Sequence, residues 1–173
     1  GKYKSLLHYS AFAQKLLDIL NPENKVSIST SIGLIIRTMN AQPLIVHNQE
    51  EIFKSTILVG AASDDTFSRM LDEHKSENII VITSDREKIY EQCIERKVKL
   101  LIITSGFVLK KELKEKAQKN GVSVIMSPYD TSATVMMIAY STPVSLMADP
   151  EIPAVHPEDS IAKVRKLIQT SPI

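Results

Sequence analysis

The chain has 173 residues, of which 43% are hydrophobic and 24% are charged, and its formal net charge is +1. This length is sufficient for one hydrophobic core, and so small a net charge gives no general attraction to nucleic acid. No apolar run approaches the roughly twenty residues that a membrane-spanning helix needs, so we expect neither a nucleic-acid nor a membrane partner.

The single cysteine, Cys93, excludes an internal disulfide and a zinc cluster built on several cysteines. It follows Ile89 by one turn of a predicted helix, so we expect a buried, unreactive thiol. The N-terminal residues GKYKSLLHY carry no signal-peptide cleavage pattern. These features together lead us to expect a cytoplasmic location.

The first elements in chain order are short. A strand within residues 4–9 and a helix over 11–20 come first, and residues 23–29 read as a polar linker. The spacing of apolar residues predicts a further helix over 30–40. Residues 42–46 are expected to form a short strand. We place it at a sheet edge, because Pro43 has no N–H to donate to a neighbouring strand.

The chain then alternates between a short apolar run and a segment with helical spacing. These runs are rich in Val, Ile and Leu without strict alternation, which indicates strands buried on both faces. Strands that alternate with helices imply crossover connections. We therefore predict an α/β fold with a mostly parallel sheet and helices on both faces. The expected strands are residues 55–62, 78–83, 99–104 and 122–127.

Capping signals accompany the helices between these strands. Asp64 or Asp65 is expected to cap the first helix, and Ser84 with Glu87 forms a capping-box pattern for the second. The third helix ends before Gly121, a typical residue after a helix C-terminus. Its lysines and glutamates are interleaved, which favours a solvated face over a binding patch.

The segment over residues 131–141 predicts a helix without a polar face. It has no charged residue, and Met136 and Met137 must point in different directions. A helix that is apolar on every side is covered on every side, either by other elements or by a second subunit. We therefore expect a homodimer with helix 130–141 in the interface. The last part, residues 143–173, predicts a further helix over 160–169.

Polar residues gather where the predicted strands end. Ligands of parallel sheets bind outside the carboxyl ends of the strands, so this edge is the candidate binding site. Under a structural interpretation, Ser84 caps a helix, Arg86 pairs with Asp85 or Asp130, and residues 104–106 form a tight turn. Under a ligand-binding interpretation the edge holds an anion or a nucleotide, although two aspartates disfavour a phosphate. The candidate residues are Thr83, Ser84, Arg86, Thr104, Ser105 and Asp130.

No arrangement for catalysis or metal binding is evident. The five glycines are not closely spaced, as a phosphate-binding loop requires, and the four histidines are scattered without acidic neighbours at ligand spacing. Asp64 and Asp65 suit a helix cap better than a cation site. We therefore expect no catalytic residue, no metal site and no cofactor in this chain.

The strand-end motifs resemble those of the DRTGG domain. Asp85-Arg86, then Thr104-Ser105-Gly106, then Ser127 to Thr131 follow in the family's order at successive strand ends. Ser84 and Ser105 stand where that family has glycine. The resemblance covers roughly residues 30–142.

The flanking segments resemble pieces of CBS (cystathionine-β-synthase-type) motifs. Residues 1–22 look like the end of a first motif, 23–142 the DRTGG-type domain, and 143–173 the start of a second motif. A nucleotide-binding CBS motif has Thr or Ser followed by Asp three residues later, and His8 and Ala11 stand at those places here. The resemblance implies adenine-nucleotide binding, and these two residues depart from its pattern.

A DRTGG domain between two CBS motifs is similar to the regulatory insert of family II inorganic pyrophosphatases, which depend on manganese or cobalt. The resemblance implies a dimeric region that relays adenine-nucleotide state to a catalytic domain outside this chain, where the metal would bind. One alternative is a DRTGG–CBS regulator of transcription or acetyl-phosphate metabolism. Another is an α/β domain that binds its own small ligand at the strand ends.

Overall fold

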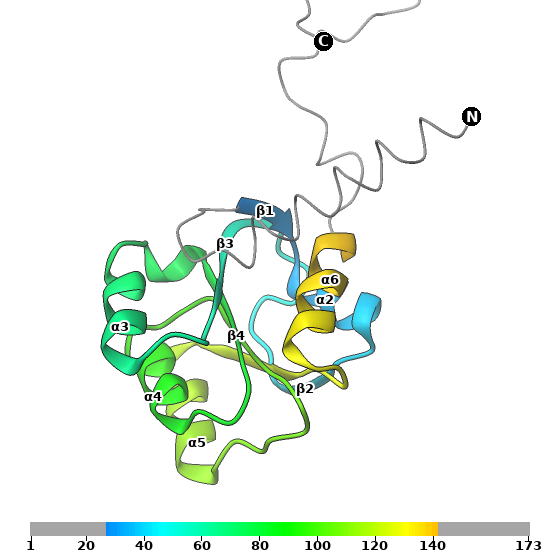
Figure 1. The fold of residues 1–173 in the computed structure, drawn as a ribbon. Coiled ribbons are helices and arrows are strands. Elements are labelled where there is room, and N and C mark those ends of the chain that lie inside the picture. Colours follow the sequence, from blue (N-terminus) through cyan, green and yellow to red (C-terminus); the bar gives the residue numbers. More distant parts are fainter. Residues whose placement is uncertain (1–26, 142–173) are drawn as a thin grey trace, which may run out of the picture. The chain divides into compact units, whose positions relative to one another are not determined.

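The computed structural model describes residues 27–141 as a six-stranded sheet with helices on both faces (Figure 1). The CBS-like segments, strand and helices predicted for residues 1–22 and 143–173 lie outside the described residues. The strands lie in the order β1-β3-β4-β5-β6-β2. Their bounds are β1 Ser27–Thr30, β2 Gln42–Ile45, β3 Phe53–Val59, β4 Ile79–Thr83, β5 Leu100–Ile103 and β6 Ser123–Met126.

The sheet is mostly parallel, as predicted. Strands β3 to β6 pair in parallel, and the two edge strands β1 and β2 pair antiparallel with β3 and β6. Every residue of β4 and β5 is buried, which explains their apolar sequence without alternation. The edge strand expected at 42–46 is confirmed as β2, with Pro43 in the outermost strand.

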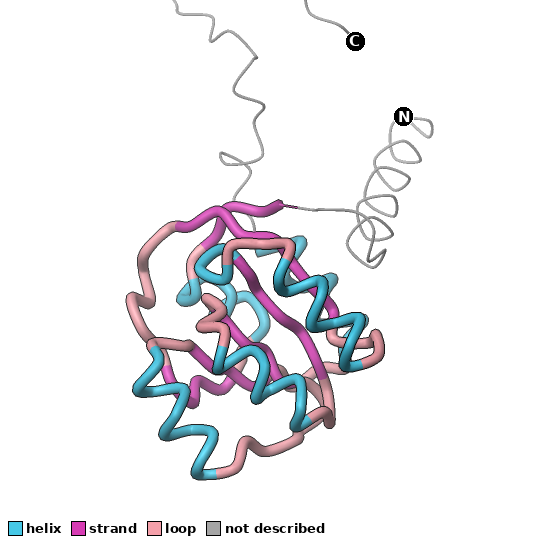
Figure 2. Tube along the Cα trace, turned by 90° about the vertical axis from the view of Figure 1, so that its left-hand side faces the viewer, coloured by secondary structure: helices cyan, strands magenta, loops and turns pink. Residues whose placement is uncertain are grey.

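The helices divide between the two faces. α3, α4 and α5 cover one face, and α2 and α6 cover the other (Figure 1). Figure 2 looks onto the first of these faces, with helices in front of the strands. The helices are α2 Ile32–Met39, α3 Asp64–Asp72, α4 Glu87–Glu95, α5 Lys111–Asn120 and α6 Thr131–Ser141, with a 3-10 turn η1 at Ser76–Asn78.

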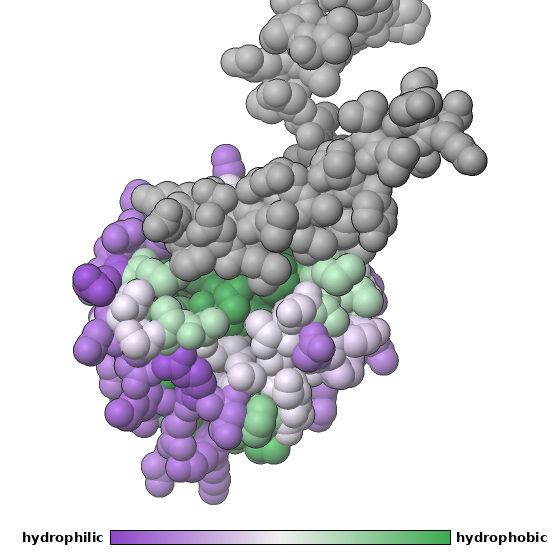
Figure 3. All heavy atoms as spheres, in the orientation of Figure 1, coloured by the Kyte–Doolittle hydropathy of each residue, from purple (hydrophilic) through white to green (hydrophobic). Residues whose placement is uncertain are grey.

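Two hydrophobic clusters fill the spaces between helices and sheet. Phe67 of α3 and Ile94 of α4 are fully buried in the first cluster. Ile35 of α2 and Ile138 of α6 are fully buried in the second. In Figure 3, hydrophilic residues gather over the side of α3, α4 and α5, and the most hydrophobic residues show at the centre of this face. None of the helices described between residues 27 and 141 is long and apolar enough to cross a membrane.

The direction of the crossovers explains this division. β3, β4, β5 and β6 are neighbours in sequence order, and right-handed crossovers in one direction place α3, α4 and α5 on the same face. After β6 the chain turns to the other face, where α6 packs beside α2. The connections after β5 and β6 therefore leave the sheet on opposite sides.

Three local predictions were wrong. Residues 27–29, expected within a polar linker, and Thr30, expected in the next helix, form β1, whose Ile28 is buried against the sheet. The cap of α3 is Ser63, whose Oγ accepts from the Thr66 N–H, so Asp64 and Asp65 lie inside the helix. α4 begins after Arg86, and Ser84 makes no capping bond. By contrast, Gly121 ends α5 with φ +73°, as predicted.

Helix α6 largely matches its prediction. Thr134, Val135 and Ile138 are buried, and Met137 packs against the second cluster. Met136 points elsewhere and is 39% exposed. The two methionines therefore lie on different faces, as the sequence indicated.

Candidate functional site

The carboxyl ends of β3, β4, β5 and β6 lie along one edge of the sheet, because these strands are parallel. Of the six residues predicted as a candidate site, Thr83 is the last residue of β4, and the other five stand in the connections that follow β4, β5 and β6. Their hydrogen bonds divide them into a group around Arg86 and a group around the turn at 104–106.

Arg86 joins the connections after β3 and β4. Its guanidinium donates to the Gly60 carbonyl at 3.2 Å, to the Ala62 carbonyl, and to Asp64 Oδ1 at 2.5 Å. The prediction that Arg86 pairs with Asp85 or Asp130 is wrong. Arg86 forms its ion pair with Asp64, in the first turn of α3. Arg86 keeps 28% of its side chain exposed, so this ion pair is only partly shielded from water.

Thr83 and Ser84 support the same connection. Thr83 is buried, and its hydroxyl donates to the Gly60 carbonyl at 3.3 Å. The contact is so close that a Cβ at Gly60 would lie 2.8 Å from the Thr83 side chain. The Ser84 carbonyl accepts from the Tyr90 hydroxyl, and burial raises the pKa of Tyr90.

Thr104, Ser105 and Asp130 hold the connections after β5 and β6 together. Thr104 Oγ1 lies 3.0 Å from Thr131 Oγ1, and the Ser105 N–H donates to the Tyr129 carbonyl at 3.3 Å. Ser105 and Gly106 both have positive φ, at 62° and 73°, which confirms the tight turn predicted at 104–106. Asp130 Oδ1 accepts from the Ala133 N–H at 2.8 Å, so Asp130 caps α6.

The two groups meet at the main-chain carbonyl of Thr83. The N–H and the hydroxyl of Thr104 both approach the Thr83 carbonyl, at 2.9 and 3.4 Å. Four of the six residues, Thr83, Arg86, Thr104 and Ser105, thus make bonds that fix one connection to another. Ser84 bonds within its own connection and to Tyr90 of α4, and Asp130 fixes the start of α6. Of the structural interpretation, the turn at 104–106 is confirmed, whereas the cap by Ser84 and the partners expected for Arg86 are not.

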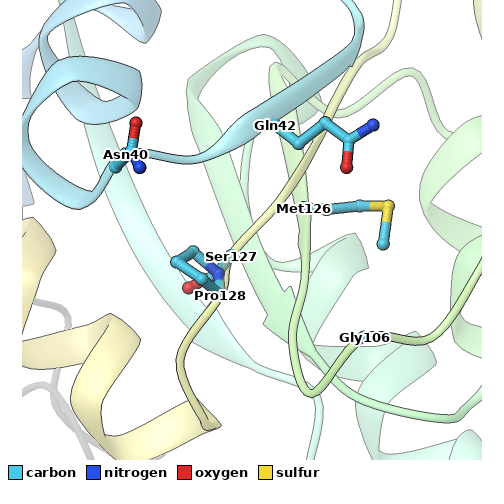
Figure 4. Close-up of a pocket in the computed structure, with 6 residues that line it drawn as sticks. All are labelled: Asn40, Gln42, Gly106, Met126, Ser127 and Pro128. Carbon is cyan, nitrogen blue, oxygen red and sulfur yellow. The ribbon is translucent and has the colours of Figure 1, made fainter.

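Sequence reasoning missed a pocket at the same edge. A hollow of about 330 Å³ lies beside the end of β6 (Figure 4). None of the six predicted residues lines it. Asn40 and Gln42 belong to an earlier part of the chain, and only the pairing of β2 with β6 brings them here. The lining residues are Asn40, Gln42, Gly106, Met126, Ser127 and Pro128.

The described residues 27–141 contain no group of three or more His, Cys, Asp or Glu side chains that could hold a metal ion. Cys93 is fully buried, and this burial raises the pKa of its thiol far above the usual value. The prediction of a buried thiol is confirmed, and its raised pKa suppresses the reactive thiolate.

Comparison with known proteins identifies relatives over most of the chain. A cobalt-dependent inorganic pyrophosphatase of Clostridium perfringens is 30% identical over 161 residues, which are 92% of this chain and 29% of that protein. A probable manganese-dependent inorganic pyrophosphatase of Thermotoga maritima is 20% identical, over 92% of this chain and 32% of that protein. The chain therefore spans about a third of the length of these relatives.

A solved structure has the same fold. It is the crystal structure of the CBS and DRTGG domains of the regulatory region of Clostridium perfringens pyrophosphatase, complexed with the activator diadenosine tetraphosphate. The TM-score is 0.60 and the identity 31%, over 82% of this chain and 60% of that one. The resemblance to pyrophosphatase regulatory regions is thus confirmed.

The family itself is shown by the central part of the chain. Residues 34–141 match the DRTGG domain, and this range contains the parallel strands β3 to β6 with the helices that follow them. The chain belongs to the DRTGG domain family.

Proposed function

We propose that this chain is the regulatory and dimerisation region of a CBS-containing inorganic pyrophosphatase. One observation carries the proposal: the likeness to two pyrophosphatases runs over 92% of this chain but over only 29% and 32% of those proteins. Nearly the whole chain thus aligns with one part of each pyrophosphatase, and the chain folds like a solved regulatory region. Both observations support a regulatory module that acts on a catalytic domain elsewhere. Manganese or cobalt would be bound by that catalytic domain.

We assign the nucleotide-sensing role to the flanking segments, residues 1–22 and 143–173, as parts of two CBS motifs. The related regulatory region was crystallised with diadenosine tetraphosphate, which supports an adenine nucleotide as the ligand. In this proposal the DRTGG domain between the flanks transmits the nucleotide-dependent state. The fixed loop contacts around Arg86 and Thr104 suit such a role, because they make the strand-end edge rigid.

We assign the dimer contact to α6. Met136 leaves 39% of its surface exposed on a helix that carries no charged residue. An apolar helix surface of this kind is stabilised when a second copy covers it.

Calorimetric titration of the whole chain tests the nucleotide assignment. AMP, ADP, ATP and diadenosine tetraphosphate are each titrated into residues 1–173, with cytidine monophosphate as the control for base identity. We expect saturable heat from at least one adenine nucleotide and none from the cytidine compound. Ala11→Asp, which restores the carboxylate of the CBS pattern, is expected to strengthen the binding. Equal heats with cytidine monophosphate, or no heat from any adenine nucleotide, would contradict the proposal.

A further inference from the structure

The pocket beside the end of β6 lies where the sheet connections change sides. The connection after β5 leads to α5 on one face, and the connection after β6 leads to α6 on the other. Two connections that diverge in this way leave a crevice between them, which is the usual ligand position in open parallel sheets. Gly106 comes from the first connection, and Ser127 and Pro128 come from the second.

The two walls of this pocket are held in place independently of any ligand. The Ser105 N–H bonds to the Tyr129 carbonyl, which links the connections. Ser127 Oγ lies 2.7 Å from Thr134 Oγ1 and accepts from the Tyr129 N–H, so its hydroxyl fixes the wall. The pocket is therefore preformed, as small-molecule sites usually are.

Asn40 and Gln42, just before β2 and at its start, line this pocket with side-chain amides. Gln42 and Met126 are paired across β2 and β6, and Figure 4 shows their side chains running alongside each other. Asn40 lies on the opposite side of β6 in the same view. Within residues 27–141 neither amide makes a hydrogen bond to a protein group, so each has a donor and an acceptor available.

The lining residues define the chemistry of the ligand. None of the six carries a charge, which disfavours a phosphate or a carboxylate. The Met126 thioether and the Pro128 ring supply apolar surface, and Gly106 has no side chain to block an approaching ring. A volume of about 330 Å³ is at the small end of ligand pockets.

We propose that this pocket binds a small, planar, uncharged molecule with adjacent hydrogen-bond donor and acceptor, such as a free nucleobase or a primary carboxamide. The ring lies against the Met126 thioether, and its polar edge pairs with the amide of Gln42, which runs alongside Met126. This site is separate from the nucleotide site assigned to the flanking segments, and it does not depend on that assignment.

Nicotinamide, nicotinate and adenine are the probes, each titrated into the whole chain while amide signals are followed by ¹H–¹⁵N NMR. Nicotinate has the shape of nicotinamide with a charged edge. We expect nicotinamide and adenine to shift the amide signals of Gln42, Gly106 and Ser127, and nicotinate to shift them far less. No shift of these signals by either neutral probe, or equal shifts by nicotinate, overturns the proposal.

Matched variants separate pocket binding from general effects. Asn40 has φ +52°, so Asn40→Gly removes the amide and keeps a backbone that glycine readily adopts. Asn48→Gly makes the same change at φ +50° outside the pocket, and Gln118→Met is the corresponding control for Gln42→Met. Gln42→Met is expected to weaken nicotinamide binding roughly five- to tenfold, as for one lost hydrogen bond, and Asn40→Gly, at the opposite wall of the pocket, is expected to weaken it less. Unchanged affinity in Gln42→Met, or an equal loss in Gln118→Met, overturns the assignment.

Discussion

At the scale of single residues, the strand-end edge is organised by bonds from side chains to loop carbonyls. Arg86 alone reaches two carbonyls and one carboxylate of the preceding connection. Thr83 and Thr104 add hydroxyl bonds between neighbouring strand ends. Each bond joins segments more than twenty residues apart in sequence. Such residues stabilise the tertiary arrangement rather than any one helix or strand.

The Arg86→Ala variant tests this role. We expect the free energy of unfolding to fall by about 1–3 kcal/mol, because the Ala62 carbonyl and the Asp64 carboxylate lose the Arg86 donor and the Gly60 carbonyl keeps only the Thr83 hydroxyl. Urea denaturation measures the change. Lys88→Ala is the control, since Lys88 lies 3.8 Å from Asp64 and is 79% exposed. Unchanged stability in Arg86→Ala, with loss of binding to a small anion, would instead favour the ligand-binding interpretation.

Replacement of Ser105 is expected to raise the free energy of unfolding, whereas replacement of Arg86 lowers it. Its φ of 62° is costly for a residue with a side chain, and it stands where the DRTGG family has glycine. Ser105→Gly is expected to raise the free energy of unfolding by about 0.5–1 kcal/mol, after the entropy that glycine gains in the unfolded chain. Thermal denaturation beside Ser132→Gly, an exposed serine in the first turn of α6, provides the comparison. If Ser105→Gly loses stability as Ser132→Gly does, the turn at Ser105 is not strained.

At the scale of elements, the two helical layers differ in character. α5 is charged on its outer face and buries only Leu113 and Ala117, so it forms a solvated surface. α6 has no charged residue and presents Met136 outward. The chemical contrast explains why the dimer contact is assigned to α6 and not to α5.

Substitution of the two methionines of α6 tests the dimer. Met136→Glu is expected to leave folding intact and to split the dimer, because it places a charge in the proposed contact. Met137→Glu is expected to lower the free energy of unfolding by about 1–3 kcal/mol, because Met137 packs against the second cluster. Sedimentation and circular dichroism measure the two effects, with Ser132→Glu as the control. A wild type that is monomeric at micromolar concentration would exclude this interface.

At the scale of the whole molecule, the described region is an α/β domain that lies in sequence between the segments to which we assign nucleotide sensing. Most of its core lies in β4, β5 and the two layers packed on them. Catalysis of pyrophosphate hydrolysis requires clustered metal ligands, and the described residues 27–141 provide no such cluster.

The four histidines of the whole sequence are also scattered, so residues 1–173 are expected to release no phosphate from pyrophosphate with manganese or cobalt. Colorimetric phosphate detection measures this, beside a no-protein blank and a chelator control. Phosphate release above the blank that disappears with chelator would show that the chain holds a catalytic metal site of its own.

The sequence by itself determined the α/β class, the four parallel strands, the edge strand at β2 and the apolar character of α6, because each depends on hydrophobic pattern and local residue type. It also predicted the turn at Ser105-Gly106 and the end of α5 at Gly121. The tertiary structure decided the partner of Arg86, since Asp64 reaches it only through the pairing of β3 with β4. It decided the pocket as well, because Asn40 and Gln42 meet Gly106 and Ser127 only when β2 adds to the edge of β6. Contacts between residues distant in sequence depend on strand order and crossover direction, which local patterns do not specify.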